Sequence, residues 1–208
     1  MKSGFDLLKD IADGQLNPSK DVYRIICDPQ VLKAGYVKLK SNPASMTPGV
    51  DEKNLNDLRI NDQYFMDLAN KLKQEIYKPK PTKKVFIPKT NGKTRPLGIP
   101  VIEDRIVQHA LLYLLEAVFE KTFSDRSHGY RPKRGAHTTC KNIRKWKGVS
   151  WFIEGDIVNY FDTINHNKLM EIINQQIKDQ QIIDLLWKFL RAGAVSYTHL
   201  TLPTIYSV

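Results

Sequence analysis

The chain has 208 residues, of which 41% are hydrophobic, so it can bury a core and does not have the composition of a disordered protein. No uninterrupted apolar stretch approaches the length of a membrane span, and the two cysteines do not form a closely spaced ligand set. The formal net charge is +10, which favours a polyanionic partner.

Residues 1–45 are predicted to form short helices, because apolar residues recur at helical spacing and Pro18 and Pro29 interrupt them. The first residues lack the apolar stretch of an export signal, so we do not expect a secreted protein. A bacterial cytoplasm and an organelle both stay open. A Pro-Gly pair within residues 47–51 predicts a turn that ends this N-terminal helical extension.

An amphipathic helix is predicted at residues 62–77, ended by the two prolines at 79 and 81. Its apolar stripe is Phe65, Leu68, Leu72 and Ile76. A β-hairpin should follow, with residues 85–87 pairing with 95–99 across Asn91 and Gly92.

Asp104 is predicted to cap the next helix, which carries a wide apolar stripe up to Val118. Residues 127–132 should form a loop because they contain Gly and Pro, and residues 136–147 a basic helix. A strand is predicted at residues 151–158, with the carboxylate of Asp156 in an apolar run. Asn165 should cap the helix that follows it, and another helix should run from Asp179 onward.

Basic residues gather in two stretches, which favours contact with nucleic acid over evenly solvated lysine-rich faces. The first stretch contains Lys78, Lys80, Lys83, Lys84, Lys89, Lys93 and Arg95. The second contains Arg131, Lys133, Arg134, Lys141, Arg144, Lys145 and Lys147.

Residues 195–208 contain no Lys, Arg, Asp or Glu, although 26% of the chain is charged. Their first part, V-S-Y-T-H-L-T-L-P-T, looks like the translation of a transposase-type sequencing adapter. We therefore interpret 195–208 as a non-native tail and expect the natural protein to continue past Ala194. The alternative is a natural β-rich C-terminal strand.

Five strings occur in an order that resembles the reverse transcriptases encoded by group II introns. They are T-P-G-V-D at 47–51, I-P-K-T-N-G-K-T-R-P-L-G-I-P at 87–100, D-R-I-V-Q at 104–108, S-H-G-Y-R-P at 127–132 and F-I-E-G-D-I-V-N-Y-F-D at 152–162. The resemblance covers about residues 36–194. It implies an α/β (α+β) fold, with the fingers of a right-hand polymerase at 46–149 and the beginning of the palm at 150–194. The Y-x-D-D string of this family is absent, so we expect the chain as written to be inactive.

The same resemblance implies roles for residues of the hairpin and the first palm strand. Lys89 and Arg95 would hold the triphosphate of an incoming nucleotide, where a cationic pair neutralises charge that shifts during phosphoryl transfer. Asp156 would be the catalytic carboxylate that binds Mg²⁺, with the backbone carbonyl of Ile157 as a second oxygen ligand. Phe161 would lie beside the ribose 2′ position, a role for which Tyr160 is the alternative.

Arg131, Lys133 and Arg134 would contact nucleic acid, although Arg131 could instead fasten its own loop. The implied activity is RNA-directed DNA synthesis with Mg²⁺ as cofactor. The implied partners are an intron RNA template, a DNA primer and deoxynucleoside triphosphates, and the RNA binding would also aid splicing and mobility. The alternatives are a non-catalytic RNA-binding maturase, or a retron, CRISPR-associated or diversity-generating reverse transcriptase.

Overall fold

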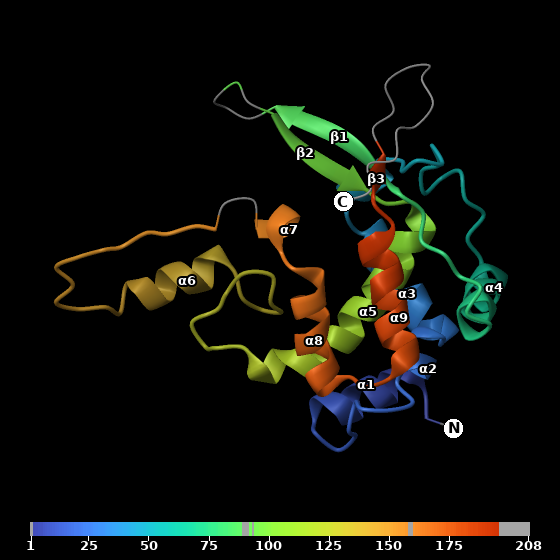
Figure 1. Ribbon diagram of the computed structural model, residues 1–208, viewed down its shortest axis with the longest axis horizontal. Coiled ribbons are helices and arrows are strands. Elements are labelled where there is room, and N and C mark those ends of the chain that lie inside the picture. Colours follow the sequence, from blue (N-terminus) through green and yellow to red (C-terminus); the bar gives the residue numbers. More distant parts are fainter. Residues whose placement is uncertain (1, 89–91, 93, 158–159, 196–208) are drawn as a thin grey trace.

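The computed structural model describes residues 2–88, 92, 94–157 and 160–195 (Figure 1). The helices are α1 (Gly4–Ala12), α2 (Tyr23–Ile26), α3 (Pro29–Lys40), α4 (Asp62–Lys73), α5 (Ile102–Phe119), α6 (Ala136–Ile143), α7 (Tyr160–Thr163), α8 (His166–Gln176) and α9 (Gln180–Arg191). Two 3-10 turns, η1 (Pro43–Met46) and η2 (Glu120–Thr122), and the strands β1 (Thr82–Pro88), β2 (Thr94–Ile99) and β3 (Ala194–Val195) complete the described part. The expected mixture of helices and strands is confirmed. No described helix is both long and apolar enough to cross a membrane.

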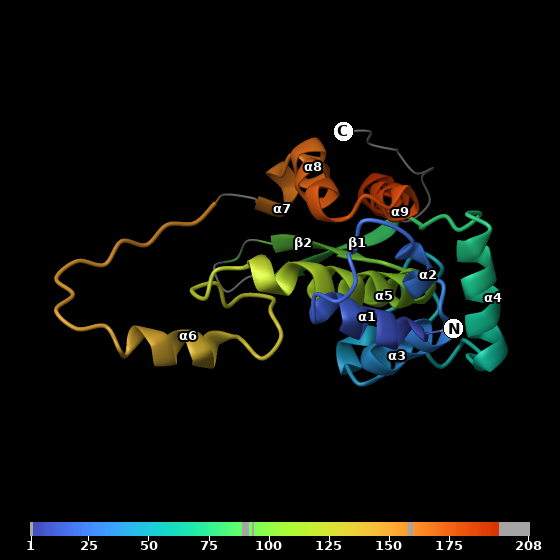
Figure 2. The same ribbon diagram turned by 90° about the horizontal axis from the view of Figure 1, so that it is seen from below.

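The long helix α5 is the centre of the helical core. Helices α8 and α9 lie on one side of it, and α1 and α3 lie on the other (Figure 2). Helices α3 and α5 pack closely at Gly35, where an added Cβ would lie 3.0 Å from the Ile106 carbonyl oxygen. The apolar residues that recur at helical spacing in the N-terminal segment are fully or almost fully buried: Val22, Ile25, Ile26, Val31 and Leu32.

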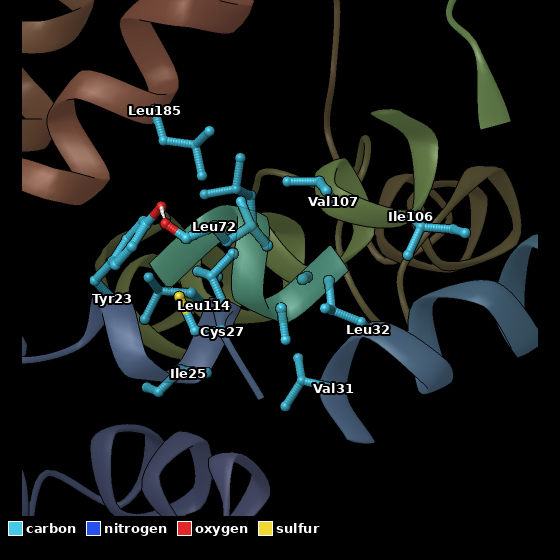
Figure 3. Packing of buried hydrophobic residues seen from close by; sticks show 14 of the residues in the cluster. Tyr23, Ile25, Cys27, Val31, Leu32, Leu72, Ile106, Val107, Leu114 and Leu185 are labelled. Atoms are coloured by element: carbon cyan, nitrogen blue, oxygen red, sulfur yellow. Dashed lines mark hydrogen bonds between the residues drawn. The ribbon is translucent and has the colours of Figure 1, made fainter. Parts of the chain in front are cut away.

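A single hydrophobic cluster joins the first helices to the last (Figure 3). It extends from Leu7 in α1 through Leu72 in α4 and Leu114 in α5 to Leu185 in α9. The N-terminal helices α1, α2 and α3 therefore pack as part of the same core as the predicted fingers, although they precede the fingers in the sequence.

The predicted hairpin is confirmed. Strands β1 and β2 pair antiparallel, with Val85 opposite Leu97 and Ile87 opposite Arg95. Strand β3 adds to the other edge of β1 in parallel, so the sheet order is β2-β1-β3. The pairing places Arg95 towards the turn of the hairpin.

Two local predictions were wrong near the hairpin. Helix α4 ends at Lys73, and Glu75 adopts a left-handed φ of 59°, so Ile76 leaves the helical stripe and is 60% exposed. Helix α5 begins at Ile102 with Val101 at the cap position, which puts Asp104 inside the first turn instead of at the cap. The cap predicted at Asn165 is confirmed, since its side chain accepts from the Lys168 N–H. The helix predicted from Asp179 onward is also confirmed, and Asp179 caps it by accepting from the Gln181 N–H.

The strand predicted at residues 151–158 is not formed over its described residues, 151–157, which have no regular secondary structure. A strand needs a neighbour to pair its N–H and C=O groups, and no described strand lies beside this segment. Residues 144–157 instead belong to the long connecting loop between α6 and α7, which extends away from the core (Figures 1 and 2). The predicted basic helix is also shorter than expected, because α6 ends at Ile143.

Candidate active site and nucleic-acid interface

A buried carboxylate fixes the point where the chain enters the hairpin. Asp104, which is 2% exposed, accepts a 2.5 Å hydrogen bond from the Tyr77 hydroxyl and a 2.9 Å bond from the Lys80 N–H. Burial raises the pKa of Asp104, and the two donated hydrogen bonds oppose that rise. Tyr77 and Lys80 stand just before β1, so this contact ties the base of the hairpin to α5.

The neighbouring Arg105 fixes the other end of the hairpin. Its guanidinium donates to the carbonyl oxygens of Pro100 at 2.8 Å, Ser45 at 2.8 Å and Thr47 at 2.5 Å. The turn at 47–51 is thereby held against the end of β2, and it approaches so closely that a Cβ on Gly49 would lie 2.8 Å from the Val101 backbone. The D-R pair of the D-R-I-V-Q string thus fastens the hairpin, a role that we did not predict. The signal in the sequence is a pair of charged residues inside an apolar helix stripe.

Helix α9 holds the same region from the opposite direction. Lys188 donates to the carbonyl oxygens of Glu75 and Tyr77 at 3.2 and 3.3 Å, and Thr82 donates its N–H to the Gly193 carbonyl at 3.0 Å. The base of the hairpin, residues 75–82, is therefore anchored to both α5 and α9.

The hairpin itself presents cations to solvent. Arg95 is exposed on β2 and makes no ion pair with any described residue, whereas Lys83 pairs with Glu52 at 3.4 Å. Lys84 lies 5.5 Å from the centre of the Phe86 ring. Lys89, the predicted partner of Arg95, lies outside the described residues. One member of the predicted triphosphate-binding pair is thus available for an anionic ligand.

The predicted catalytic segment lies apart from the hairpin. Asp156 is exposed and accepts a 2.9 Å hydrogen bond from the Ile157 N–H, while Ile157 and Phe161 are 65% and 76% exposed. Tyr160 and Phe161 contact each other with ring centres 5.7 Å apart. No described hydrogen bond, ion pair or ring contact joins Asp156 to Arg95. The described structure therefore does not bring the predicted metal-binding residue into contact with the predicted triphosphate-binding residue.

The described residues do not make a magnesium site on their own. A carboxylate and a backbone carbonyl, as at Asp156 and Ile157, are ligands that suit Mg²⁺. A pair of metal ions needs several such oxygens. Within the described ranges, however, no group of three or more His, Cys, Asp or Glu side chains could hold a metal ion.

Arg131 is enclosed by its own loop, with a side chain that is only 5% exposed. Its guanidinium donates to the Glu120 carboxylate, at 2.8 Å in the shortest bond, and to the carbonyls of Ser124 at 2.7 Å and Ser127 at 2.9 Å. It also lies 5.3 Å from the centre of the Phe123 ring. The hydrogen bond from Arg131 lowers the pKa of Glu120. Of the two roles weighed for Arg131, the geometry favours fastening the loop over gripping nucleic acid.

Lys133 and Arg134 differ from Arg131 in accessibility. Lys133 is exposed and forms no ion pair with a described residue. Arg134 is partly exposed and pairs with Asp125 at 3.0 Å. Both side chains are accessible to nucleic acid. Arg134 would first have to break its ion pair with Asp125, whereas Lys133 has no ion pair with a described residue to break.

Residues 87–204, more than half of the chain, match the family described as reverse transcriptase (RNA-dependent DNA polymerase). The chain therefore belongs to the reverse transcriptase family. The matched range ends inside the segment 195–208, so the foreign origin of that segment stays a prediction.

Relatives confirm the resemblance to group II intron proteins. The chain is 38% identical over 174 residues to the group II intron-encoded protein LtrA of Lactococcus lactis subsp. cremoris, covering 83% of this chain and 29% of LtrA. It is 39% identical over 181 residues to protein YkfC of Escherichia coli, covering 83% and 47%. It is 36% identical over 93 residues to nuclear intron maturase 1, mitochondrial, of Arabidopsis thaliana, covering 44% and 13%. The chain thus spans less than half the length of each of these relatives.

Proposed function

We propose that this chain is the fingers and the first palm segment of an RNA-directed DNA polymerase encoded by a group II intron. Its partners would be the intron RNA as template, a DNA primer and deoxynucleoside triphosphates. The observation that carries the proposal is the hairpin anchored at both ends, on which Arg95 stands without an ion-pair partner among the described residues. A cation held in place before the reaction stabilises developing phosphate charge without reorganisation.

Asp156 and the carbonyl of Ile157 would supply two oxygens of a Mg²⁺ site completed by residues outside the described part. Bound Mg²⁺ would polarise phosphate oxygens. Phe161 would line the sugar of the incoming nucleotide and disfavour a 2′-hydroxyl there. Support for these roles comes from the position of these residues in the F-I-E-G-D-I-V-N-Y-F-D string and from family membership.

Titration of the chain with a deoxynucleoside triphosphate tests the role of Arg95. Arg95→Ala should weaken binding several-fold, because a charge-assisted contact to phosphate is lost. Arg24→Ala is the matched control, since Arg24 is an exposed arginine on α2 in the helical core. Equal effects of the two substitutions would contradict a specific phosphate site on the hairpin.

The chain as written should bind RNA without extending a primer. RNA affinity should fall steeply with salt, with a slope of roughly −0.7 for each phosphate neutralised on a single strand. Anisotropy measurements across a salt series check the first statement, and a primer-extension assay with Mg²⁺ checks the second. An affinity independent of salt would refute the electrostatic mechanism, and template-dependent extension would show that the metal site is complete within this chain.

A further inference from the structure

The loop between η2 and α6 exposes one aromatic ring almost completely. Tyr130 is 96% exposed, and its backbone adopts a left-handed φ of 54°. Residues other than glycine rarely adopt this conformation, and large side chains least of all. Apolar burial does not explain a tyrosine here, because its ring packs against nothing.

The residues on both sides of Tyr130 are held rigidly. Arg131 is fastened by Glu120, Ser124 and Ser127 through the hydrogen bonds described above. On the other side, the His128 ring lies between the Thr138 hydroxyl, 2.7 Å from Nδ1, and the Asn142 side-chain amide, 3.0 Å from Nε2. The ring of Tyr130 is thus exposed to solvent on a loop that hydrogen bonds hold in place on both sides.

The segment that carries this ring also carries exposed cations. The nearby acidic groups are engaged, since Glu120 pairs with Arg131 and Asp125 pairs with Arg134. Arg126 and Lys133 are exposed and form no ion pair with any described residue. An exposed aromatic ring with unpaired cations on both sides of it in the sequence is a combination that binds single-stranded nucleic acid, with a base stacked on the ring and phosphates on the cations.

We propose that Tyr130 is a stacking platform for an unpaired RNA base, and that Lys133 and Arg126 contact the phosphates on either side of that base. This inference rests on the proposed RNA-binding function and assigns it a site. It also divides the S-H-G-Y-R-P string into Tyr130, which touches the ligand, and His128 and Arg131, which hold the loop.

A double-mutant cycle between the protein and the RNA tests the stacking contact. The probe is a fluorescein-labelled single-stranded RNA, compared with the same backbone carrying a central run of abasic residues. Tyr130→Ala should weaken binding of the intact RNA roughly 5- to 150-fold, as removal of one base–aromatic stack does. It should leave binding of the abasic RNA unchanged, and Tyr130→Phe should keep the affinity of the unaltered chain for both.

Two further measurements separate stacking from charge and from folding. Tyr130→Ala should leave unchanged the slope of log affinity against log salt concentration for RNA binding. Lys133→Ala should reduce the magnitude of this slope by roughly 0.7, the contribution of one neutralised phosphate on a single strand. The melting temperature of Tyr130→Ala should equal that of the unaltered chain, because the ring makes no packing contact.

If the chain binds RNA and Tyr130→Ala binds it equally well, the stacking role is wrong while the proposed function stands. Equal weakening for intact and abasic RNA would also overturn the stacking role. No salt-dependent RNA binding by the unaltered chain would remove the RNA-binding part of the proposed function, and this inference with it.

Discussion

The contact between Tyr77 and Asp104 offers the sharpest test of how the hairpin is held. Both side chains are buried, at 3% and 2% exposure, and the hydroxyl donates to the carboxylate at 2.5 Å. Tyr77→Phe removes the donor and leaves the carboxylate with the Lys80 N–H as its remaining partner. A hydrogen bond to a charged group contributes about 1.5–3 kcal/mol, so the free energy of unfolding should fall by about that amount.

The effect of Tyr77→Phe should depend on the presence of Asp104. Asp104→Ala leaves two buried donors, the Tyr77 hydroxyl and the Lys80 N–H, without an acceptor, at a cost of about 2–5 kcal/mol. In that background the hydroxyl is already unsatisfied, so adding Tyr77→Phe removes a penalty instead of a bond. The second substitution should then be neutral or stabilising.

The coupling free energy between Tyr77 and Asp104 is measured by urea unfolding of the unaltered chain, the two single variants and the double variant, monitored by far-UV circular dichroism at neutral pH. The expected coupling is at least about 1.5 kcal/mol. The reasoning would be refuted if Tyr77→Phe destabilised the unaltered chain and Asp104→Ala equally, within the ~0.5 kcal/mol by which independent sites are additive.

Three further outcomes are expected. Burial raises the pKa of Asp104 above its ordinary value of about 4, so the folded chain keeps this proton to a higher pH than the unfolded chain does. The stability that comes from this difference is present at low pH and declines as the pH rises through the pKa of the folded chain. Asp104→Asn should flatten that part of a profile of unfolding free energy against pH. Asp179→Ala should cost about 2–4 kcal/mol in urea unfolding, since it removes a helix cap and also the acceptor of the Val22 and Tyr23 N–H groups, whereas Asn165→Ala, which removes a cap alone, should cost about 1 kcal/mol. Gly49→Ala should cost about 1–3 kcal/mol because its Cβ meets backbone at 2.8 Å, while Gly129→Ala, with no atom within 4 Å, should stay within ~0.5 kcal/mol; a similar loss in both would contradict the close approach at Gly49.

Features set by neighbouring residues could be predicted from the sequence. The turn signal at Asn91 and Gly92 correctly predicted that β1 and β2 form a hairpin, and helix starts were correctly predicted at Asn165 and Asp179. These determinants act within a few residues of the structure that they specify, so no knowledge of the tertiary fold is required.

Features that depend on distant partners could not be predicted in the same way. The strand predicted around Asp156 needs a neighbouring strand, and none of the described strands provides it. The role of Arg131 depends on where the loop carries Ser124 and Ser127 relative to Glu120, which no pattern of spacing specifies. Even Ile76, which fits a helical stripe, became exposed because the chain turns at Glu75 towards contacts with α9.

The carboxylate of Asp179 has a consequence for the order in which the protein can fold during its synthesis. It accepts the N–H groups of Val22 and Tyr23, which precede it by 157 and 156 residues. At a translation rate of about 5–20 residues per second, the ribosome needs roughly 8–30 s to add that length of chain. During this interval α2 lacks its acceptor, and the core around it lacks Ile182 and Leu185. Helices α1 and α2 therefore keep part of their apolar surface uncovered until α9 has been made.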